Sequence, residues 1–314
     1  MPLISIILPT HNRPKLLEEA IESVIAQNIT DWELIIIDDN SNPPVDKQYI
    51  QNKFSHKVHV LHHNLSKGGS LSKNTGIEVA KGKYIAFLDD DDLYAPTYLE
   101  EAINTLEKYP EISTLFMGVS WFGPKAEWAE KDYDKAMSKV LADANGETLP
   151  DNILKFDARL FDALLKRVPM AFQRPVTLKR NLQQIGLFHN TLLWDCDWAL
   201  RAALNKTCGL HNDGLYLQRT AGQGYSSKPS RRLEHMQSNL EIKKSLYNTA
   251  KSSCHRRSIK QAIINVGEAI TWEYMNQKKG AQALIAIIKT FRFGFSLSQV
   301  KFFFHALLIL ITKK

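Results

Sequence analysis

Cysteine is scarce in this chain of 314 residues, and the cysteines that are present form no pattern. Cys196, Cys208 and Cys254 are an odd number, and none of them forms a Cys-x-x-Cys pair. This argues against a disulfide framework and against a zinc site, and it suits a reducing compartment such as the cytosol. The first residues also lack a basic segment ahead of an apolar run, so we predict no signal peptide there.

Other absences narrow the class of protein further. The sequence contains no internal repeat, no low-complexity segment and no run of membrane-spanning helices. With 44% hydrophobic and 23% charged residues, it has the composition of an ordinary globular protein and not of a disordered or collagen-like one. Residues 9–13 after the first apolar run are not a glycine-rich phosphate loop, which argues against a nucleotidyltransferase.

Acidic residues are scarce toward the C-terminus. Residues 228–314 contain 16 lysines and arginines but only 4 acidic residues, whereas residues 1–227 contain 24 basic and 29 acidic residues. This asymmetry predicts that the C-terminal region meets an anionic partner, with a solvated basic helical surface as the alternative. Nucleic acid could use the same charge, but no nucleic-acid-binding motif is present, so we expect no nucleic-acid partner.

Apolar runs and helical periodicities alternate through the first 120 residues. We predict strands at residues 3–8, 34–37, 58–61 and 84–88, and helices at 14–27 and 71–80. Continuous apolar strands separated by helices predict an α/β fold with a parallel sheet covered on both faces. Beyond it we expect loops and helices at 121–175, a short strand or turn and helices at 179–185 and 194–204 within 176–204, and helices from about residue 230.

Two acidic clusters directly follow predicted strands. They are Asp38-Asp39 and the four aspartates at 89–92. Because the carboxyl ends of such strands form the ligand-binding edge of open α/β sheets, both clusters should meet in one cleft. Four adjacent aspartates repel one another unless a positive charge offsets them. A divalent cation is one solution, since Mg²⁺ and Mn²⁺ bind oxygen ligands and bridge to phosphates; an acidic helix start in a solvated loop is the other.

Several motifs in matching order and spacing resemble family 2 glycosyltransferases with the GT-A fold. They are Ser-Ile-Ile-Leu-Pro-Thr-His-Asn-Arg at 5–13, Ile-Asp-Asp-Asn-Ser at 37–41, Asn-Thr-Gly-Ile at 74–77, and residues 82–92. The resemblance covers residues 3 to about 108 and, less closely, 175–227. It implies a Rossmann-like, mostly parallel sheet flanked by helices. It also implies an inverting, metal-dependent hexosyl- or N-acetylhexosaminyltransferase that uses a nucleotide-sugar, expected to be a UDP-sugar.

The resemblance also implies roles for residues on the donor side. Asp39 would accept a hydrogen bond from the nucleotide base, in a pocket that Pro9, Thr10 and Asn12 line. Lys73 stands where such proteins often have arginine and would contact the donor diphosphate; an exposed helix residue is the alternative.

The Asp-x-Asp motif of the family matches residues 89–91. Asp89 and Asp91 would hold Mn²⁺ or Mg²⁺, with Asp91 as the direct ligand, and Asp90 would contribute to binding the nucleotide-sugar. Asp92 would support the site from the start of the next helix.

The catalytic base is expected at the start of a later helix. Asp197 aligns with the family residue that deprotonates the acceptor, while Asp195 is the rival if the register slips by two residues. A helix N-cap without a catalytic role is the alternative for Asp197. Cys196 and Thr220 depart from the family pattern. The Gln-x-x-Arg-Trp signature of processive members is absent, which favours transfer of a single sugar.

These observations predict a catalytic domain at 1–227, with a nucleotide-sugar half at 1–120 and an acceptor half at 121–227, and a basic helical region at 228–314. The apolar run 302–312 is about half of the roughly 20 residues that a spanning helix needs. We therefore expect a peripheral anchor on the anionic inner face of the cell membrane, with a glycan or lipid-linked acceptor of bacterial surface-glycan synthesis. A helix packed on protein or on a second subunit is the alternative for this segment. The alternatives for the activity are transfer to a polyprenyl phosphate and a catalytically silent scaffold that binds nucleotide or glycan.

Overall fold

The computed structural model describes residues 1–205, 207–220 and 231–312. The chain divides into two compact units, Met1–Asn190 with Trp194–Ala221, and Thr191–Leu193 with Gly222–Lys314. The predicted domain boundary at 227/228 lies outside the described residues.

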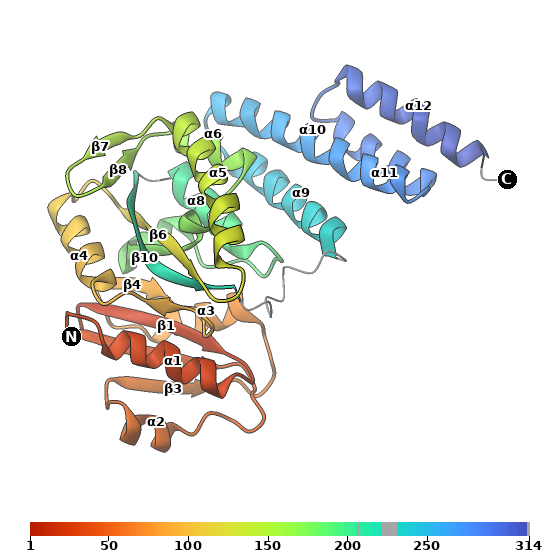
Figure 1. The fold of residues 1–314 in the computed structure, drawn as a ribbon. Helices are drawn as coiled ribbons and strands as arrows, with labels where there is room; N and C mark the ends of the chain where they lie inside the picture. Colours follow the sequence, from red (N-terminus) through yellow and green to blue (C-terminus); the bar gives the residue numbers. More distant parts are fainter. Residues whose placement is uncertain (206, 221–230, 313–314) are drawn as a thin grey trace. The chain divides into compact units, whose positions relative to one another are not determined.

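The first unit is built on a ten-stranded sheet whose N-terminal half is parallel. In this half the strand order is β3 (Val58–His62), β2 (Trp32–Asp38), β1 (Ile4–Thr10) and β4 (Tyr84–Phe87) (Figure 1). The connecting helices are α1 (Pro14–Ile25), α2 (Lys47–Lys53) and α3 (Gly69–Val79). Right-handed crossovers place α1 and α2 on one face of the sheet and α3 on the other. The strands and helices predicted for the first 88 residues are confirmed.

The continuous apolar runs exist because both faces of these strands are covered. Ile6 and Ile7 point to opposite faces of β1, and both are fully buried. On one face, α3 approaches the sheet so closely that a Cβ atom at Gly76 would lie 2.4 Å from Cγ2 of Ile7. Any side chain at this position would push α3 away from β1, and α3 carries residues of the acidic site described below.

Antiparallel pairs extend the sheet beyond β4. The order continues with β9 (Pro175–Leu178), β6 (Thr114–Phe122), β10 (Cys208–Arg219), β8 (Ile153–Phe156) and β7 (Glu147–Leu149), while β5 (Leu93–Tyr94) pairs with β10. Strand β9 is antiparallel to both β4 and β6, and β6 is parallel to β10. The expectation of only loops and helices at 121–175 is wrong at β7 and β8. Strand β7 is the edge strand at this end of the sheet, and β8 pairs with both β7 and β10; both are short and lack the long apolar run that marks a buried strand.

Helices complete the first unit around this half of the sheet. They are α4 (Tyr98–Lys108), α5 (Ala126–Ala144), α6 (Arg159–Lys166), α7 (Leu182–Ile185) and α8 (Trp194–Asn205), with short 3-10 turns at Met170–Gln173 and Lys179–Asn181. The helical segments predicted at 179–185 and 194–204 are confirmed.

The second unit is helical in its described part, as predicted. Its helices are α9 (Arg232–Thr249), α10 (Ser253–Asn276), α11 (Gly280–Phe291) and α12 (Leu297–Thr312). Helix α10 packs against α9 and α11, and α12 packs on α10 and α11. A Cβ atom at Gly280 would lie 2.7 Å from the backbone nitrogen of Leu310, so glycine lets α11 begin against the backbone of α12. Among the described residues, no helix is both long enough and apolar enough to span a bilayer.

Candidate functional site

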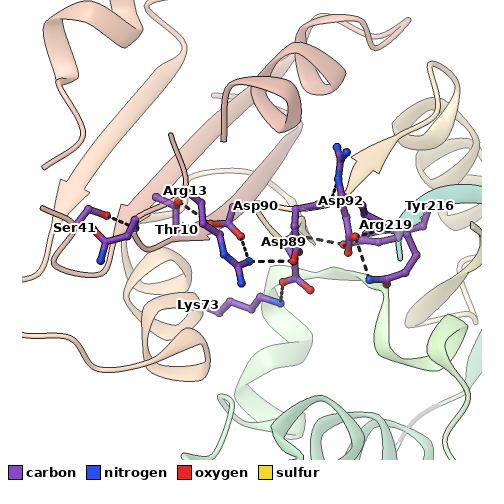
Figure 2. A network of polar contacts seen from close by, with 12 residues as sticks. Thr10, Arg13, Ser41, Lys73, Asp89, Asp90, Asp92, Tyr216 and Arg219 are labelled. Carbon is purple, nitrogen blue, oxygen red and sulfur yellow. Dashed lines mark hydrogen bonds and ion pairs between the residues drawn. The ribbon is translucent and has the colours of Figure 1, made fainter. Parts of the chain in front are cut away.

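The four aspartates that follow β4 meet polar side chains from the ends of β1 and β10, from α3 and from the segment before β9. Figure 2 shows that Arg13, Lys73 and Tyr216 approach three of these aspartates from different elements. The site is therefore assembled from residues far apart in the sequence, and each aspartate has its own set of partners.

Asp90 and Asp91 are tied to the end of β1. The hydroxyl of Thr10 donates to Oδ2 of Asp90 at 2.8 Å. The guanidinium of Arg13 reaches Oδ1 of Asp90 at 2.9 Å and Oδ2 of Asp91 at 3.0 Å. Burial raises the pKa of Asp90, and the charge of Arg13 opposes that rise. The contacts of Asp90 hold the loop after β1 against the aspartate cluster, so the structure places it as a support within the site.

Asp89 lies between two cationic side chains. Nζ of Lys73 is 2.7 Å from Oδ1 of Asp89, and the guanidinium of Arg174 is 3.4 Å from Oδ2. Burial alone would raise the pKa of Asp89, but the charges of Lys73 and Arg174 outweigh burial and lower it to about 2. Asp89 is therefore ionised at neutral pH.

Asp92 is the most enclosed member of the cluster. Its side chain is fully buried, and it accepts hydrogen bonds from the hydroxyl of Tyr216 at 2.9 Å, the amide of Gln218 at 3.0 Å and the backbone N–H of Arg219 at 2.9 Å. Burial raises the pKa of Asp92 to about 7, although the nearby charge of Arg174 opposes the rise. Asp92 thus ties the cluster to β10. The expectation that it lies at the start of a helix is wrong, because it directly precedes strand β5 and α4 begins only at Tyr98.

Arg13, Lys73 and Arg174 offset part of the negative charge that was one reason to expect a metal ion at these aspartates. Arg174 is itself 95% buried, and its guanidinium stacks on the ring of Tyr216 with 4.6 Å between Cζ and the ring centroid. Neither Arg13 nor Arg174 was a candidate site residue, because no local spacing links them to the aspartates. The four-aspartate motif itself was the only signal that basic partners would be needed.

Asp89 and Asp91 nevertheless have the donor chemistry of a Mg²⁺ or Mn²⁺ site. Both offer carboxylate oxygens, and both side chains are 27% exposed. Within residues 1–205, 207–220 and 231–312, no group of three or more His, Cys, Asp or Glu side chains is arranged to hold a metal ion. The two aspartates therefore fit a cation that takes its remaining ligands from substrate phosphates and water.

Asp39, the predicted base-binding residue, is already surrounded by donors. Oδ1 lies 2.7 Å from Nδ1 of His63 and 2.8 Å from the N–H of Lys67, while Oδ2 accepts from Ser66 and from the N–H of Gly68. Although burial opposes ionisation, these hydrogen bonds lower the pKa of Asp39. A carboxylate has about four acceptor positions, so one of these contacts must open before Asp39 can accept from a base.

Thr10 and Asn12 line a cavity of about 490 Å³ between α1, α2 and the loop after β2. The N–H of Asn12 donates to the hydroxyl of Ser41 at 2.9 Å, which joins the loops after β1 and β2. Pro9 lies inside β1, opposite Ile37 of β2. The structure thus brings Thr10 and Asn12 to one hollow, while Asp39 faces the loop at 66–68.

Lys73 is not the exposed helix residue that was one alternative, because its side chain is only 2% exposed. Besides its contact with Asp89, Nζ lies 4.2 Å from the centroid of the Trp194 ring at the start of α8. Lys73 therefore links α3, the aspartate cluster and α8.

Asp197, the predicted catalytic base, lies in a structural ion pair. Oδ2 of Asp197 is 2.9 Å from the guanidinium of Arg201, one turn along α8, and 2.9 Å from Nδ1 of His189. Arg201 also donates to the carbonyl oxygens of Ile185 and Leu187. The pair thus braces the turn before α8, and its buried carboxylate faces Arg201 instead of the aspartate cluster. This geometry disfavours Asp197 as the base.

Asp195, unlike Asp197, lies near the charged groups of the aspartate cluster. It is half-buried in the first turn of α8, and the charges of Lys73, Asp89 and Arg174 all act on it. Burial raises the pKa of Asp195 to about 7; Asp89 adds to this rise, while Lys73 and Arg174 oppose it. The structure therefore associates Asp195, and not Asp197, with the aspartate cluster. Asp195 is the residue that the sequence offers as the base if the register slips by two residues.

The family comparison covers about half of the chain. Residues 5–166 match Glycosyl transferase family 2. A Campylobacter jejuni relative, named as a GalNAc(5)-diNAcBac-PP-undecaprenol beta-1,3-glucosyltransferase, is 40% identical over 109 residues, which are 34% of this chain and 34% of the relative. The aligned segment spans between 13% and 41% of the length of seven further curated relatives, so the chain matches less than half of each.

Solved structures with the same fold cover nearly the whole chain. Staphylococcus aureus TarS 1-349, in complex with UDP-GlcNAc, has a TM-score of 0.64 at 15% identity and covers 93% of this chain and 81% of its own. The mannosyltransferase PcManGT from Pyrobaculum calidifontis, in complex with GDP-Man and Mn²⁺, has a TM-score of 0.56 at 16% identity, covering 98% and 81%. At this identity, the likeness establishes the GT-A type of fold.

Proposed function

Because this chain belongs to glycosyl transferase family 2, we propose that it moves one sugar from a nucleotide-sugar to an acceptor hydroxyl, with inversion at the anomeric carbon. The transferred group is a hexosyl or N-acetylhexosaminyl residue. The observation that carries this proposal is the aspartate cluster after β4, in which Asp89 and Asp91 are each 27% exposed and lie against Lys73 and Arg13. Burial raises the pKa of Asp195, in the first turn of α8, to about 7. A base with a pKa near neutrality suits the deprotonation of a hydroxyl at physiological pH.

The aspartates after β4 provide the donor side of the reaction. Asp91 and Asp89 would hold Mg²⁺ or Mn²⁺, which supplies charge neutralisation for the departing diphosphate when it is bound. Lys73 and Arg13 orient Asp89 and Asp91 through contacts of 2.7 and 3.0 Å, and the charge of Lys73 also lowers the pKa of Asp89. Thr10 and Asn12 contribute to the nucleotide pocket. Asp39 joins them if the loop at 66–68 releases one of its contacts with the carboxylate.

Asp195 would accept the proton of the acceptor hydroxyl as its oxygen attacks the anomeric carbon. Proton transfer to a positioned base typically accelerates such a step by about 10²–10⁴-fold. Nζ of Lys73 lies over the ring of Trp194, and the ion pair of Asp197 and Arg201 supports the turn before α8. These contacts would hold Asp195 at a fixed distance from the donor site, and accurate placement is itself a large part of such catalysis.

We expect a UDP-sugar as donor and a growing bacterial surface glycan, in lipid-linked form, as acceptor. The UDP-GlcNAc complex of TarS supports the first expectation, and the name of the Campylobacter relative, which specifies an undecaprenol-linked glycan, supports the second. The basic excess of residues 228–314 supports work at the anionic inner face of the membrane. The same features would serve a transferase that acts on polyprenyl phosphate itself.

Donor hydrolysis by the full chain tests the activity without knowledge of the acceptor. We expect slow release of nucleoside diphosphate from one member of a nucleotide-sugar panel with Mn²⁺ or Mg²⁺, and loss of this release with EDTA. Asp91→Asn should lose it as well. Asp151→Asn is the matched control, because Asp151 lies in an exposed pair with Lys108.

The result also separates the alternatives. Metal-dependent nucleotide binding without any release, even when a polyprenyl phosphate is added, would favour a silent scaffold. Neither binding nor release with any donor would contradict the proposed function.

A further inference from the structure

Helix α12 carries a continuous stripe of large apolar side chains that face solvent. The stripe consists of Leu297, Val300, Phe304, Leu308 and Ile311, which are between 43% and 84% exposed. Their spacing of three or four residues places all five on one side of the helix. The aligned stripe extends over most of the sixteen residues of α12.

The opposite side of α12 already has its packing partners. Ala306 is fully buried against Met275 and Ala283. Gln299 is also fully buried, and its amide donates to the hydroxyl of Thr290 at 3.0 Å. The solvent-facing stripe is therefore not the side with which α12 packs on its own helical unit. It is a second apolar face, and contiguous exposed apolar surface of this kind marks an interaction site.

The chain segment that carries the stripe has charge of only one sign, although Glu268 of α10 accepts a hydrogen bond from Ser296, next to Leu297. Residues 274–314 contain seven lysines and arginines and no acidic residue. Lys301 is exposed and lies one turn from both Leu297 and Phe304, so it sits at the edge of the stripe. Helix α11 adds two exposed isoleucines, Ile285 and Ile288, followed one turn later by the exposed Arg292.

We propose that this apolar stripe of α12, with its basic flank, docks onto an anionic lipid bilayer and lies along the surface of the bilayer. An apolar stripe bordered by lysine and arginine matches the boundary between acyl chains and anionic headgroups. A second copy of the chain is a poorer occupant, because paired stripes would bring basic flanks together with no acidic residue from this segment between them. This inference deepens the proposed function, since it names the surface that would bring the enzyme to a lipid-linked acceptor.

Flotation of the full chain with vesicles tests the docking surface. We expect binding to phosphatidylcholine vesicles that contain about a third phosphatidylglycerol, with weak binding to pure phosphatidylcholine. Adding 0.5 M NaCl should reduce the binding at least several-fold. The double variant Phe304→Ser, Leu308→Ser should bind anionic vesicles at least tenfold less tightly, because it removes two apolar side chains from the middle of the stripe.

A matched control removes the same kind of side chain elsewhere. Trp128 and Val79 are exposed apolar residues of the first unit, so Trp128→Ser, Val79→Ser should leave vesicle binding unchanged. Circular dichroism would check that both double variants remain folded. The proposal is overturned if the wild-type chain does not float, or if the stripe variant floats as well as the control.

Light scattering at increasing protein concentration tests whether a second copy of the chain binds to the stripe instead. A dimer that the stripe variant abolishes, without vesicle binding by the wild type, would assign this face to a second copy of the chain. Donor hydrolysis in the absence of vesicles keeps the two proposals apart. Full hydrolysis with no vesicle binding would overturn the docking surface alone, and vesicle binding without hydrolysis would overturn the transferase alone.

Discussion

The aspartate cluster after β4 and the ion pair of Asp197 and Arg201 are two charged regions of the first unit that differ in how their charges are compensated. In the ion pair, one carboxylate oxygen meets both an arginine and a histidine at 2.9 Å, and the arginine also closes the turn before α8. Around the cluster, the compensation is incomplete. Burial raises the pKa of both Asp92 and Asp195 to about 7.

Two aspartates in the first turn of one helix thus have opposite surroundings. Asp197 lies in a buried ion pair with Arg201, whereas burial makes the charge of Asp195 costly to the fold. A carboxylate that is kept in a costly position next to other charged groups is a candidate for catalysis, because its pKa is then suited to proton transfer. Alignment to a motif therefore identifies the helix, and the surroundings of each carboxylate indicate which of the two residues is suited to catalysis.

Removal of the metal should strongly lower the rate of transfer, because the proposed metal site lies at the aspartate cluster. It should leave the ion pair of Asp197 and Arg201 unchanged. We expect EDTA, or Asp91→Asn, to lower the rate of transfer by about 10²–10³-fold, since metal ions contribute several kcal/mol to such steps. Titration of Mn²⁺ into the EDTA-treated enzyme should restore the rate for the wild type and not for the variant. Thermal unfolding should change little in both cases. Undiminished transfer in EDTA would contradict the metal site.

The pH dependence of transfer should distinguish Asp195 from Asp197 as the base. With the pKa of Asp195 raised to about 7, the base is protonated in acid, so kcat/KM should fall about tenfold for each pH unit below 7. The folded pKa lies above the unfolded value of about 3.9, so folding disfavours the ionised form, and this cost appears as the pH rises from about 4 to 7. A profile that is flat from pH 5.5 to 8.5 would count against Asp195.

The ion pair should show its effect in stability. We expect Asp197→Asn to lower the free energy of unfolding by about 3 kcal/mol, because breaking a buried pair leaves an uncompensated charge. Asp143→Asn is the control, since Asp143 pairs with Lys166 on the surface and should cost less than about 1 kcal/mol. Urea denaturation measures both variants. Equal stability losses would show that the brace has no special role.

Most of the parallel half of the fold could be predicted from the sequence, because β1, β2 and β4 are buried on both faces and form continuous apolar runs. Helix α2 was not predicted, since Ile50 is its only buried residue. Strands β7 and β8 could not be predicted either, because strands of three and four residues carry no comparable apolar pattern. The C-terminal helices were predicted, but the division of α12 into a packed side and an exposed apolar stripe required the structure. An apolar run on its own does not say which side faces solvent.

The candidate site could be predicted in part. The four aspartates and Lys73 were identified, because they lie in motifs or directly after strands. Arg174 was not, because it lies far from the aspartates in the sequence and reaches them only through the antiparallel β9 region. The choice between Asp195 and Asp197 rested on an alignment of two residues in one helical turn. Only their neighbours in the structure distinguish the two carboxylates: Asp197 lies against Arg201, and Asp195 lies near the charges of the cluster.

The most direct test of this account compares Asp195→Asn and Asp197→Asn in one assay of acceptor-dependent transfer, at equal concentrations of folded enzyme. We expect Asp195→Asn to lose about 10²–10⁴-fold in kcat without a lower Tm above pH 7. Asp197→Asn should keep its rate within about tenfold but melt earlier. Loss of transfer in folded Asp197→Asn, together with near-normal transfer by Asp195→Asn, would contradict the assignment of the base.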